Sequence, residues 1–178
     1  MADFIISNRI VNNFVVLDFE TTGFSSAKDK IIQVAALRYQ DFKLVDQFVS
    51  FINPEVSIPY RIQALTGISN LDVIHAPRAI ELIPELIQFI NDDILVAHNA
   101  RFDASFLVEN INRYISTRKT FEFADTVQLA KQAFQLPNYK LETLKHHLHL
   151  SHLASHEAQA DCFVTAEVYK HCAKVRFS

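Results

Sequence analysis

The sequence has little glycine, proline or cysteine for its 178 residues: 2 Gly, 5 Pro and 2 Cys. It also lacks low-complexity tracts and long runs of like charge, which argues against a disordered tail or an internal linker. Hydrophobic residues make up 49% of the chain, enough to bury a sizeable core at this length. We therefore expect one globular domain over residues 1–178.

Long apolar runs are absent too, and the N-terminal MADFIISNRI has no basic stretch followed by an apolar one. No membrane span or export signal is therefore visible, and we expect no membrane partner. Cys162 and Cys172 fall on one expected helix, where ten residues separate them by roughly 15 Å, too far for a disulfide. Unpaired cysteines fit a reducing compartment, so we expect a cytoplasmic protein.

The chain also lacks a large net charge of either sign. The net charge is -3 and the isoelectric point is near 6.2, without the basic surface expected of a protein that holds nucleic acid by neutralising phosphates alone. This balance argues weakly against a simple nucleic-acid-binding module. It argues less against an enzyme whose bound divalent cations reverse the charge of an acidic cleft.

Runs rich in Val, Ile and Phe, separated by turn-like breaks, predict strands, and apolar residues at helical spacing predict helices. The first three strands have short links typical of an antiparallel meander, and the helices around the last two should make those strands parallel to the first. Pro84 should kink or break its helix. The expected strands are 14–20, 31–39, 43–52, 94–98 and 120–124, and the expected helices are 78–91, 101–114, 126–134, 141–149 and 158–174. The chain is thus predicted to be an α/β protein with a mixed five-stranded sheet and helices on both faces.

Two carboxylates lie two residues apart on the first of these strands, in the sequence DFETTG. Asp18 and Glu20 should project from the same face, because side chains alternate along a strand. Removing two uncompensated carboxylates from water costs several kcal/mol for each charge, so a positively charged group should lie between them. An isolated pair of this kind is more often an exposed strand end.

Two further blocks carry acidic residues where helices begin. In HNARFD, Asp103 lies in or near the first turn of the helix that follows a strand, although a carboxylate there can simply be stabilised by the helix dipole. In HEAQAD, His156 and Asp161 can converge if the helix begins after the histidine. A single loop histidine is usually unremarkable, but the coincidence of three such blocks is not.

Taken together, DFETTG, HNARFD and HEAQAD resemble the three motifs of the DEDD exonuclease family, in its histidine-containing branch. That family includes the proofreading component of bacterial replicative DNA polymerases, ribonuclease T and oligoribonuclease. The resemblance extends over residues 14–172 and includes ALTGIS at 64–69 and the Asp-Thr pair at 125–126. It implies a ribonuclease H-like fold and 3′→5′ hydrolysis that releases nucleoside 5′-monophosphates.

The resemblance also implies a role for individual residues. Asp18, Glu20, Asp103 and Asp161 would bind two divalent cations, Mg²⁺ or Mn²⁺, and His156 would be the general base. Substrate contacts would come from Thr21, Thr22, Leu65, Asn99 and Phe102, although an aromatic at the helical spacing of Phe102 is more often a core residue. Gln33 departs from the family, which often has Glu in the second strand.

The expected substrate is the 3′ end of single-stranded nucleic acid, with DNA favoured over RNA, and a DNA polymerase subunit is the expected protein partner. Two alternatives stay open: an exoribonuclease that trims RNA, and a non-catalytic polymerase accessory subunit. The histidines of KHHLHLSHLASH could also assemble a transition-metal site, although a polar surface connection explains them adequately. Gly23 and Gly67 lie in the motif loops, where a close approach or a positive φ would need them, and Asp125 is typical of a helix N-cap.

Overall fold

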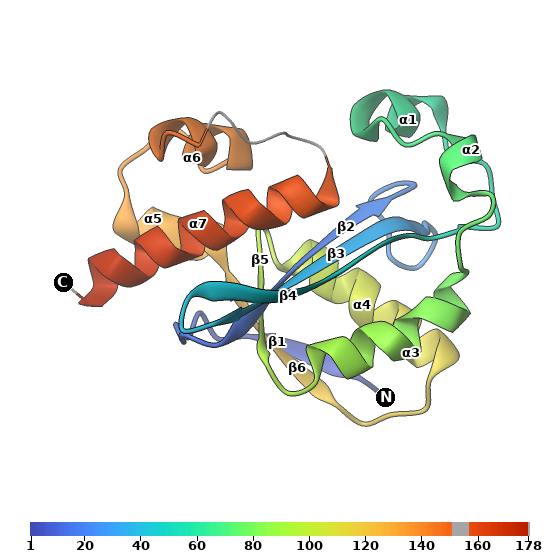
Figure 1. Ribbon diagram of the computed structural model, residues 1–178, viewed down its shortest axis with the longest axis horizontal. Coiled ribbons are helices and arrows are strands. Elements are labelled where there is room, and N and C mark those ends of the chain that lie inside the picture. The colour runs from blue at the N-terminus through green and yellow to red at the C-terminus, as the bar shows by residue number, and fades with distance from the viewer. Residues whose placement is uncertain (151–156, 178) are drawn as a thin grey trace.

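The computed structural model describes residues 1–150 and 157–177, and its elements follow the expected order closely (Figure 1). The strands are β1 (Asp3–Ile6), β2 (Phe14–Thr21), β3 (Ile31–Gln40), β4 (Lys43–Phe51), β5 (Ile94–Ala97) and β6 (Thr120–Asp125). The helices are α1 (Tyr60–Thr66), α2 (Asn70–Val73), α3 (Ala79–Ile90), α4 (Arg101–Tyr114), α5 (Thr126–Ala133), α6 (Leu141–His147) and α7 (Ala158–Phe177).

The six strands of the described residues join one sheet in the order β1-β6-β5-β2-β3-β4. The meander β2-β3-β4 is antiparallel, and β5 pairs parallel with both β2 and β6, as the sequence predicts. The predicted count of five strands was wrong, because β1 adds a sixth beside β6. This strand has only four residues at the sheet edge, none of them buried, which is too short for a periodicity to stand out.

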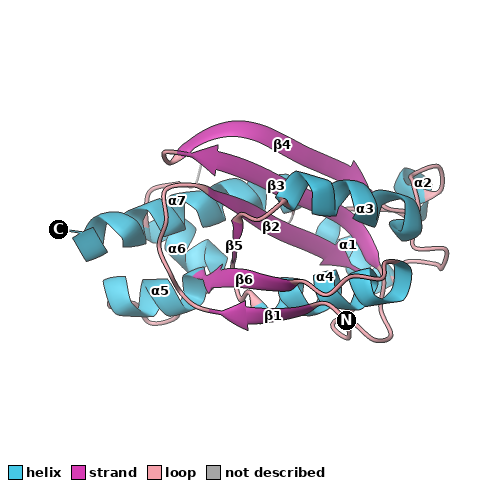
Figure 2. Ribbon diagram, turned by 90° about the horizontal axis from the view of Figure 1, so that it is seen from below, coloured by secondary structure: helices cyan, strands magenta, loops and turns pink. Residues whose placement is uncertain are grey.

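Helices cover both faces of the sheet, giving three layers (Figures 1 and 2). The odd positions of β2 (Val15, Leu17 and Phe19) point into a core formed with α3 and α4. The even positions Phe14 and Val16 point into a second core formed with α5, α6 and α7. Both faces of the central strand are thus buried, which explains its almost uninterrupted apolar sequence. The α/β fold with a mixed sheet is therefore confirmed.

Pro84 lies inside α3, which continues through it from Ala79 to Ile90 instead of breaking. A proline removes one backbone hydrogen bond and leaves the carbonyl four residues earlier without its usual donor. That residue is Ile80, which is 49% exposed, so water can reach this part of the helix. Within the described residues, no helix combines the length and the hydropathy needed to cross a membrane.

Candidate active site

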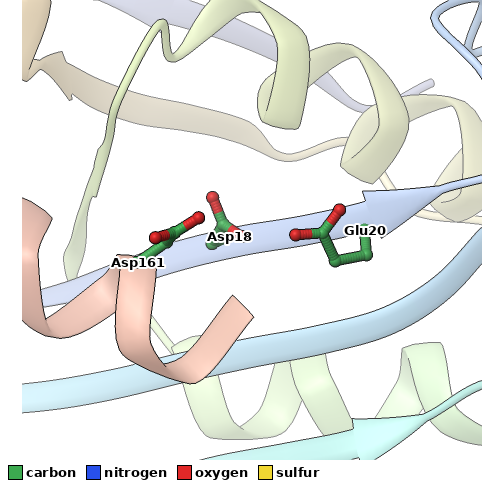
Figure 3. A group of neighbouring side chains, drawn as sticks. All are labelled: Asp18, Glu20 and Asp161. Atoms are coloured by element: carbon green, nitrogen blue, oxygen red, sulfur yellow. The ribbon is translucent and has the colours of Figure 1, made fainter. Parts of the chain in front are cut away.

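Three carboxylates from two elements meet beside the centre of the sheet (Figure 3). Asp18 and Glu20 project from the same face of β2, and Asp161 reaches them from the first turn of α7. One oxygen from each of the three carboxylates lies within 4.8 Å of the others. Acidic residues of the first and third sequence blocks thus lie together in the structure.

The start of α7 is fixed by the neighbouring strands, which sets the position of Asp161. The side-chain oxygen of Gln33, buried on β3 directly opposite Glu20, accepts a hydrogen bond from the Ala158 backbone N–H at 3.2 Å. At the surface, the Gln159 amide donates to Gln47 of β4 at 2.9 Å. Gln33 therefore anchors the turn of helix from which Asp161 extends.

Asp103 lies in the first turn of α4 and is only 2% exposed. Its Oδ1 accepts a hydrogen bond from the Phe19 N–H at 3.0 Å, between Asp18 and Glu20 on the strand. This bond arises because β2 pairs with β5 only as far as Val16, leaving the later backbone of β2 to other partners. Asp103 thus faces the same cavity as the other three carboxylates while bracing the strand that carries two of them.

Burial and mutual repulsion make the carboxyl groups of Asp18, Glu20 and Asp103 reluctant to ionise. Burial, and then the charges of Asp103, Glu20 and Asp161, raise the pKa of Asp18 well above its ordinary value. Burial and the charge of Asp161 raise the pKa of Glu20 to about 7. Burial also raises the pKa of Asp103 to about 8, even though two backbone hydrogen bonds act in the opposite direction. A bound cation would remove this repulsion and favour the ionised forms.

The four carboxylates lie in a cavity of about 200 Å³. Among the predicted substrate-binding residues, its lining includes Thr21, Leu65, Asn99 and Phe102. Leu65 of α1 is half-exposed there, so it is available to a ligand. Asn99 adopts a left-handed φ of 61° in the turn between β5 and α4, a conformation that Asn tolerates better than most residues.

The lining also includes Phe24 and His98, which the sequence analysis did not single out. The Phe24 ring is 77% exposed and lies 6.5 Å from the Phe102 ring, edge to face. The available signal was an aromatic directly after the DFETTG motif, in a segment otherwise rich in small and polar residues. His98 is the first residue of the HNARFD block. Its place in the cavity could not be predicted, because no sequence pattern links it to another residue of the site.

His98 lines the cavity and also contacts the first residue of α5. Its Nδ1 lies 2.8 Å from the Thr126 hydroxyl oxygen, which in turn donates to the Ala97 carbonyl. Burial lowers the pKa of His98, while Asp125 and the backbone carbonyl of Tyr139 act against that shift. A neutral imidazole at neutral pH follows from the net direction.

The loop between β2 and β3 is held by its own hydrogen bonds. Thr21 donates from its hydroxyl to the Gly23 carbonyl at 2.5 Å, and Thr22 accepts from the Lys30 N–H at 2.9 Å. The Thr22 side chain therefore supports the loop, whereas Thr21 also borders the cavity. A Cβ at Gly23 would come within 2.5 Å of the Asp29 carboxyl carbon, and Gly67 has φ +74°, so close approach and positive φ explain the two glycines.

Asp125 caps α5 as predicted, since its side chain accepts from the Val127 N–H at 2.9 Å. The same oxygen accepts from the Asn99 N–H at 3.1 Å, which ties the cap to the β5–α4 turn. The predicted general base, His156, lies outside the described residues, as does His152 of the histidine-rich segment. Of the other histidines there, His146 lies 3.8 Å from Glu142 and the ring of His147 packs against Phe134.

The relatives that match this chain include DNA polymerase III proteins. The chain is 40% identical over 160 residues to the DNA polymerase III PolC-type of Clostridium perfringens, covering 89% of this chain but 11% of that protein. It is 32% identical to the DNA polymerase III subunit epsilon of Aquifex aeolicus, over 91% of this chain and 81% of that protein. The chain thus spans about a tenth of the length of the PolC-type relatives and most of the epsilon subunit.

Solved structures show the same fold. E. coli Exonuclease I in complex with a dA16 oligonucleotide superposes with a TM-score of 0.77 at 20% identity, over 93% of this chain and 41% of that one. The family model described as Exonuclease matches residues 15–169, which include every described acidic residue of the cavity. The chain therefore belongs to the exonuclease family.

Proposed function

We propose that this chain is a two-metal-ion 3′→5′ exonuclease that removes nucleoside 5′-monophosphates from single-stranded DNA. The observation that carries the proposal is the meeting of Asp18, Glu20 and Asp161 within 4.8 Å in a cavity that Asp103 also lines. Residues 1–178 are proposed to form one exonuclease domain, since all six strands belong to a single sheet with a core on each face.

The donor set fits hard divalent cations. All four acidic residues offer oxygen ligands, which Mg²⁺ and Mn²⁺ prefer. The raised pKa values of Asp18, Glu20 and Asp103 reflect burial and the neighbouring negative charges. Two such ions would supply positive charge for the scissile phosphate and for the oxygens that attack and depart. Asp18, Glu20, Asp103 and Asp161 are the proposed ligands.

The remaining side chains suit the binding of a terminal nucleotide. Leu65 and Phe102 present apolar surface on which a base can pack, and Phe24 extends that surface. Asn99 and the Thr21–Thr22 segment are proposed to contact the sugar and phosphate. His156, the first residue of HEAQAD, is proposed to take the proton of the attacking water, a role that commonly contributes about 10²–10⁴-fold.

Single-stranded DNA is proposed as the substrate because relatives of this chain are named as parts of DNA polymerase III. The same relatives support a DNA polymerase subunit as a partner in proofreading or repair. Both cysteines are free, which agrees with the cytoplasmic location that such a role requires. RNA trimming remains the alternative activity that the same cavity could perform.

The test is digestion of matched 5′-labelled single-stranded DNA and RNA oligonucleotides in Mg²⁺. We expect a ladder that shortens from the 3′ end, faster for DNA, and its loss in EDTA. The Asp18→Ala variant should lose at least roughly 100-fold in rate, because one carboxylate of the two-metal set is gone.

Asp46→Ala is the matched control, since Asp46 is an exposed aspartate on β4 away from the cavity. It should digest DNA at the wild-type rate. Full activity in Asp18→Ala would contradict the assignment of this cavity as the active site. Faster digestion of RNA would assign RNA as the substrate in place of DNA. Inactivity on both oligonucleotides would favour the accessory-subunit alternative.

A further inference from the structure

A second groove, with a volume of about 560 Å³, begins where the catalytic cavity ends. His98 and Asn99 line both the cavity and the groove, so the two form a continuous surface across the carboxyl end of β5. The far wall of the groove comes from α5 and from the loop that leads into α6. Its volume lies in the range of about 300–1,000 Å³ that small-ligand sites occupy.

The groove and the cavity differ in charge. Four carboxylates line the cavity, whereas the charged residues among the described lining of the groove are Lys131 and Lys140. Both lysines are exposed at its rim. In a chain with a net charge of -3, this pair provides local positive charge directly beside the acidic site.

The loop that carries this charge is held in place by its own contacts. The Tyr139 hydroxyl donates to the Phe134 carbonyl at 2.9 Å. The Asn138 side-chain oxygen accepts from the Lys140 N–H at 3.1 Å and from the Thr143 hydroxyl at 2.6 Å. The loop is therefore shaped before any ligand binds, which reduces the entropy that binding would cost.

Tyr139 adds an aromatic surface between the two lysines. Its side chain is partly exposed, and the Lys131 ammonium lies 6.0 Å from its ring centre. Cationic groups that follow a phosphate backbone, combined with an aromatic ring that can stack on a base, are the usual components of a single-strand binding track. Val127 and Leu141 provide apolar wall beside them.

We propose that this groove binds the nucleotides on the 5′ side of the one being removed. Lys131 and Lys140 contact their phosphates, Tyr139 stacks on a base, and the strand passes over His98 and Asn99 into the catalytic cavity. The inference rests on the proposed exonuclease function and adds to it a track that holds the substrate strand between successive cleavages.

The first test measures binding without cleavage. A 5′-fluorescein single-stranded DNA decamer is titrated in EDTA at several salt concentrations, and its fluorescence anisotropy is followed. Each lysine that neutralises a phosphate on a single strand contributes about 0.7 to the slope of log K against log salt. The double variant Lys131→Ala/Lys140→Ala should therefore lower the magnitude of that slope by about 1.4, and Lys131→Arg/Lys140→Arg should restore it.

The second test compares a long with a short substrate in Mg²⁺. The p-nitrophenyl ester of thymidine 5′-monophosphate has no upstream nucleotide, whereas the decamer has nine in line with the groove. In Lys131→Ala/Lys140→Ala, the ratio of kcat/KM for the decamer to that for the ester should fall roughly tenfold, mainly through KM for the decamer. The matched control Lys43→Ala/Lys174→Ala removes two exposed lysines elsewhere and should keep the wild-type ratio.

These outcomes separate the groove from the proposed activity. A wild-type salt slope in Lys131→Ala/Lys140→Ala overturns the proposal that the groove binds the strand, whatever the enzyme cleaves. Equal losses on the decamer and the ester overturn it as well, because they would indicate a general structural defect. If the wild-type chain cleaves neither substrate, the exonuclease proposal fails, and the salt slope in EDTA still decides the groove.

Discussion

At the scale of single residues, the main physical fact is the concentration of buried negative charge. Asp103 is buried and Asp18 is half-buried, their carboxyl groups lie close to Glu20 and Asp161, and all the shifted pKa values among these residues are raised. A fold that served only stability would gain by replacing such groups with apolar ones. Their presence fits the proposed function, which needs cations.

The raised pKa values predict how stability depends on pH when metal is absent. Between the ordinary Glu20 pKa of 4.5 and its folded value of about 7, the folded protein holds a proton that the unfolded chain releases. This contribution to stability is fully present below pH 4.5 and is lost as pH rises through about 7. The free energy of unfolding in EDTA should therefore fall between pH 5 and pH 8.

Urea denaturation of wild type and Glu20→Gln across this range measures the effect. The variant should show a shallower decrease, because one of the groups that takes up a proton on folding is gone. Asp46→Gln, changed at an exposed position, should follow the wild-type curve. Identical pH slopes in wild type and Glu20→Gln would contradict the raised pKa of Glu20.

At the scale of elements, the site depends on how α7 is anchored to the sheet. The bond from Ala158 N–H to the buried Gln33 side chain fixes the helix three residues before Asp161. The Gln33 amide supplies an oxygen acceptor here without adding a fifth negative charge opposite Glu20. Gln33 therefore acts as a positioning residue.

Replacing Gln33 by Leu should test this role, since the size is kept and the acceptor is lost. We expect unfolding to become easier by about 1–3 kcal/mol, the usual effect of leaving a buried N–H without a partner. Mn²⁺ should also bind more weakly, because Asp161 loses its fixed position. Gln47→Leu, which removes the surface bond to Gln159, should cost no more than about 0.5 kcal/mol.

The readouts are urea denaturation for stability and calorimetric titration for Mn²⁺ affinity. Gln33→Glu keeps the acceptor, so it should retain most of the stability at low pH while disturbing Glu20 through its charge. Wild-type Mn²⁺ affinity in a folded Gln33→Leu protein would show that the anchor does not position Asp161.

Several parts of these elements were predictable from sequence for identifiable reasons. The apolar runs of the central strands and the helical spacing of the long helices are strong because each element buries at least one full face. The four residues of β1 and the short helices α1 and α2 escaped detection, because neither has room for a repeating pattern. Tertiary contacts decide such short elements.

At the scale of the whole molecule, the sheet order explains why distant sequence blocks meet. β2 lies at the centre, β5 pairs with it on one side and β3 on the other, so the ends of β2 and β5 and the start of α7 converge. Asp18, Glu20, Asp103 and Asp161 could be proposed as a group beforehand, because they lie in three short sequence motifs. Phe24, His98 and the Lys131–Lys140 groove could not, because their proximity arises only from folding.

The most direct test of the central claim is calorimetric titration of the metal-free chain with Mn²⁺. The four-carboxylate cavity predicts binding of two ions per chain, with binding strengthening as pH rises because protons compete for the same oxygens. Asp18→Asn should lose at least one of the two ions, while Asp46→Asn should bind both. Absence of Mn²⁺ binding to the wild-type chain, or unchanged binding to Asp18→Asn, would contradict the assignment of this cavity as a two-metal exonuclease site.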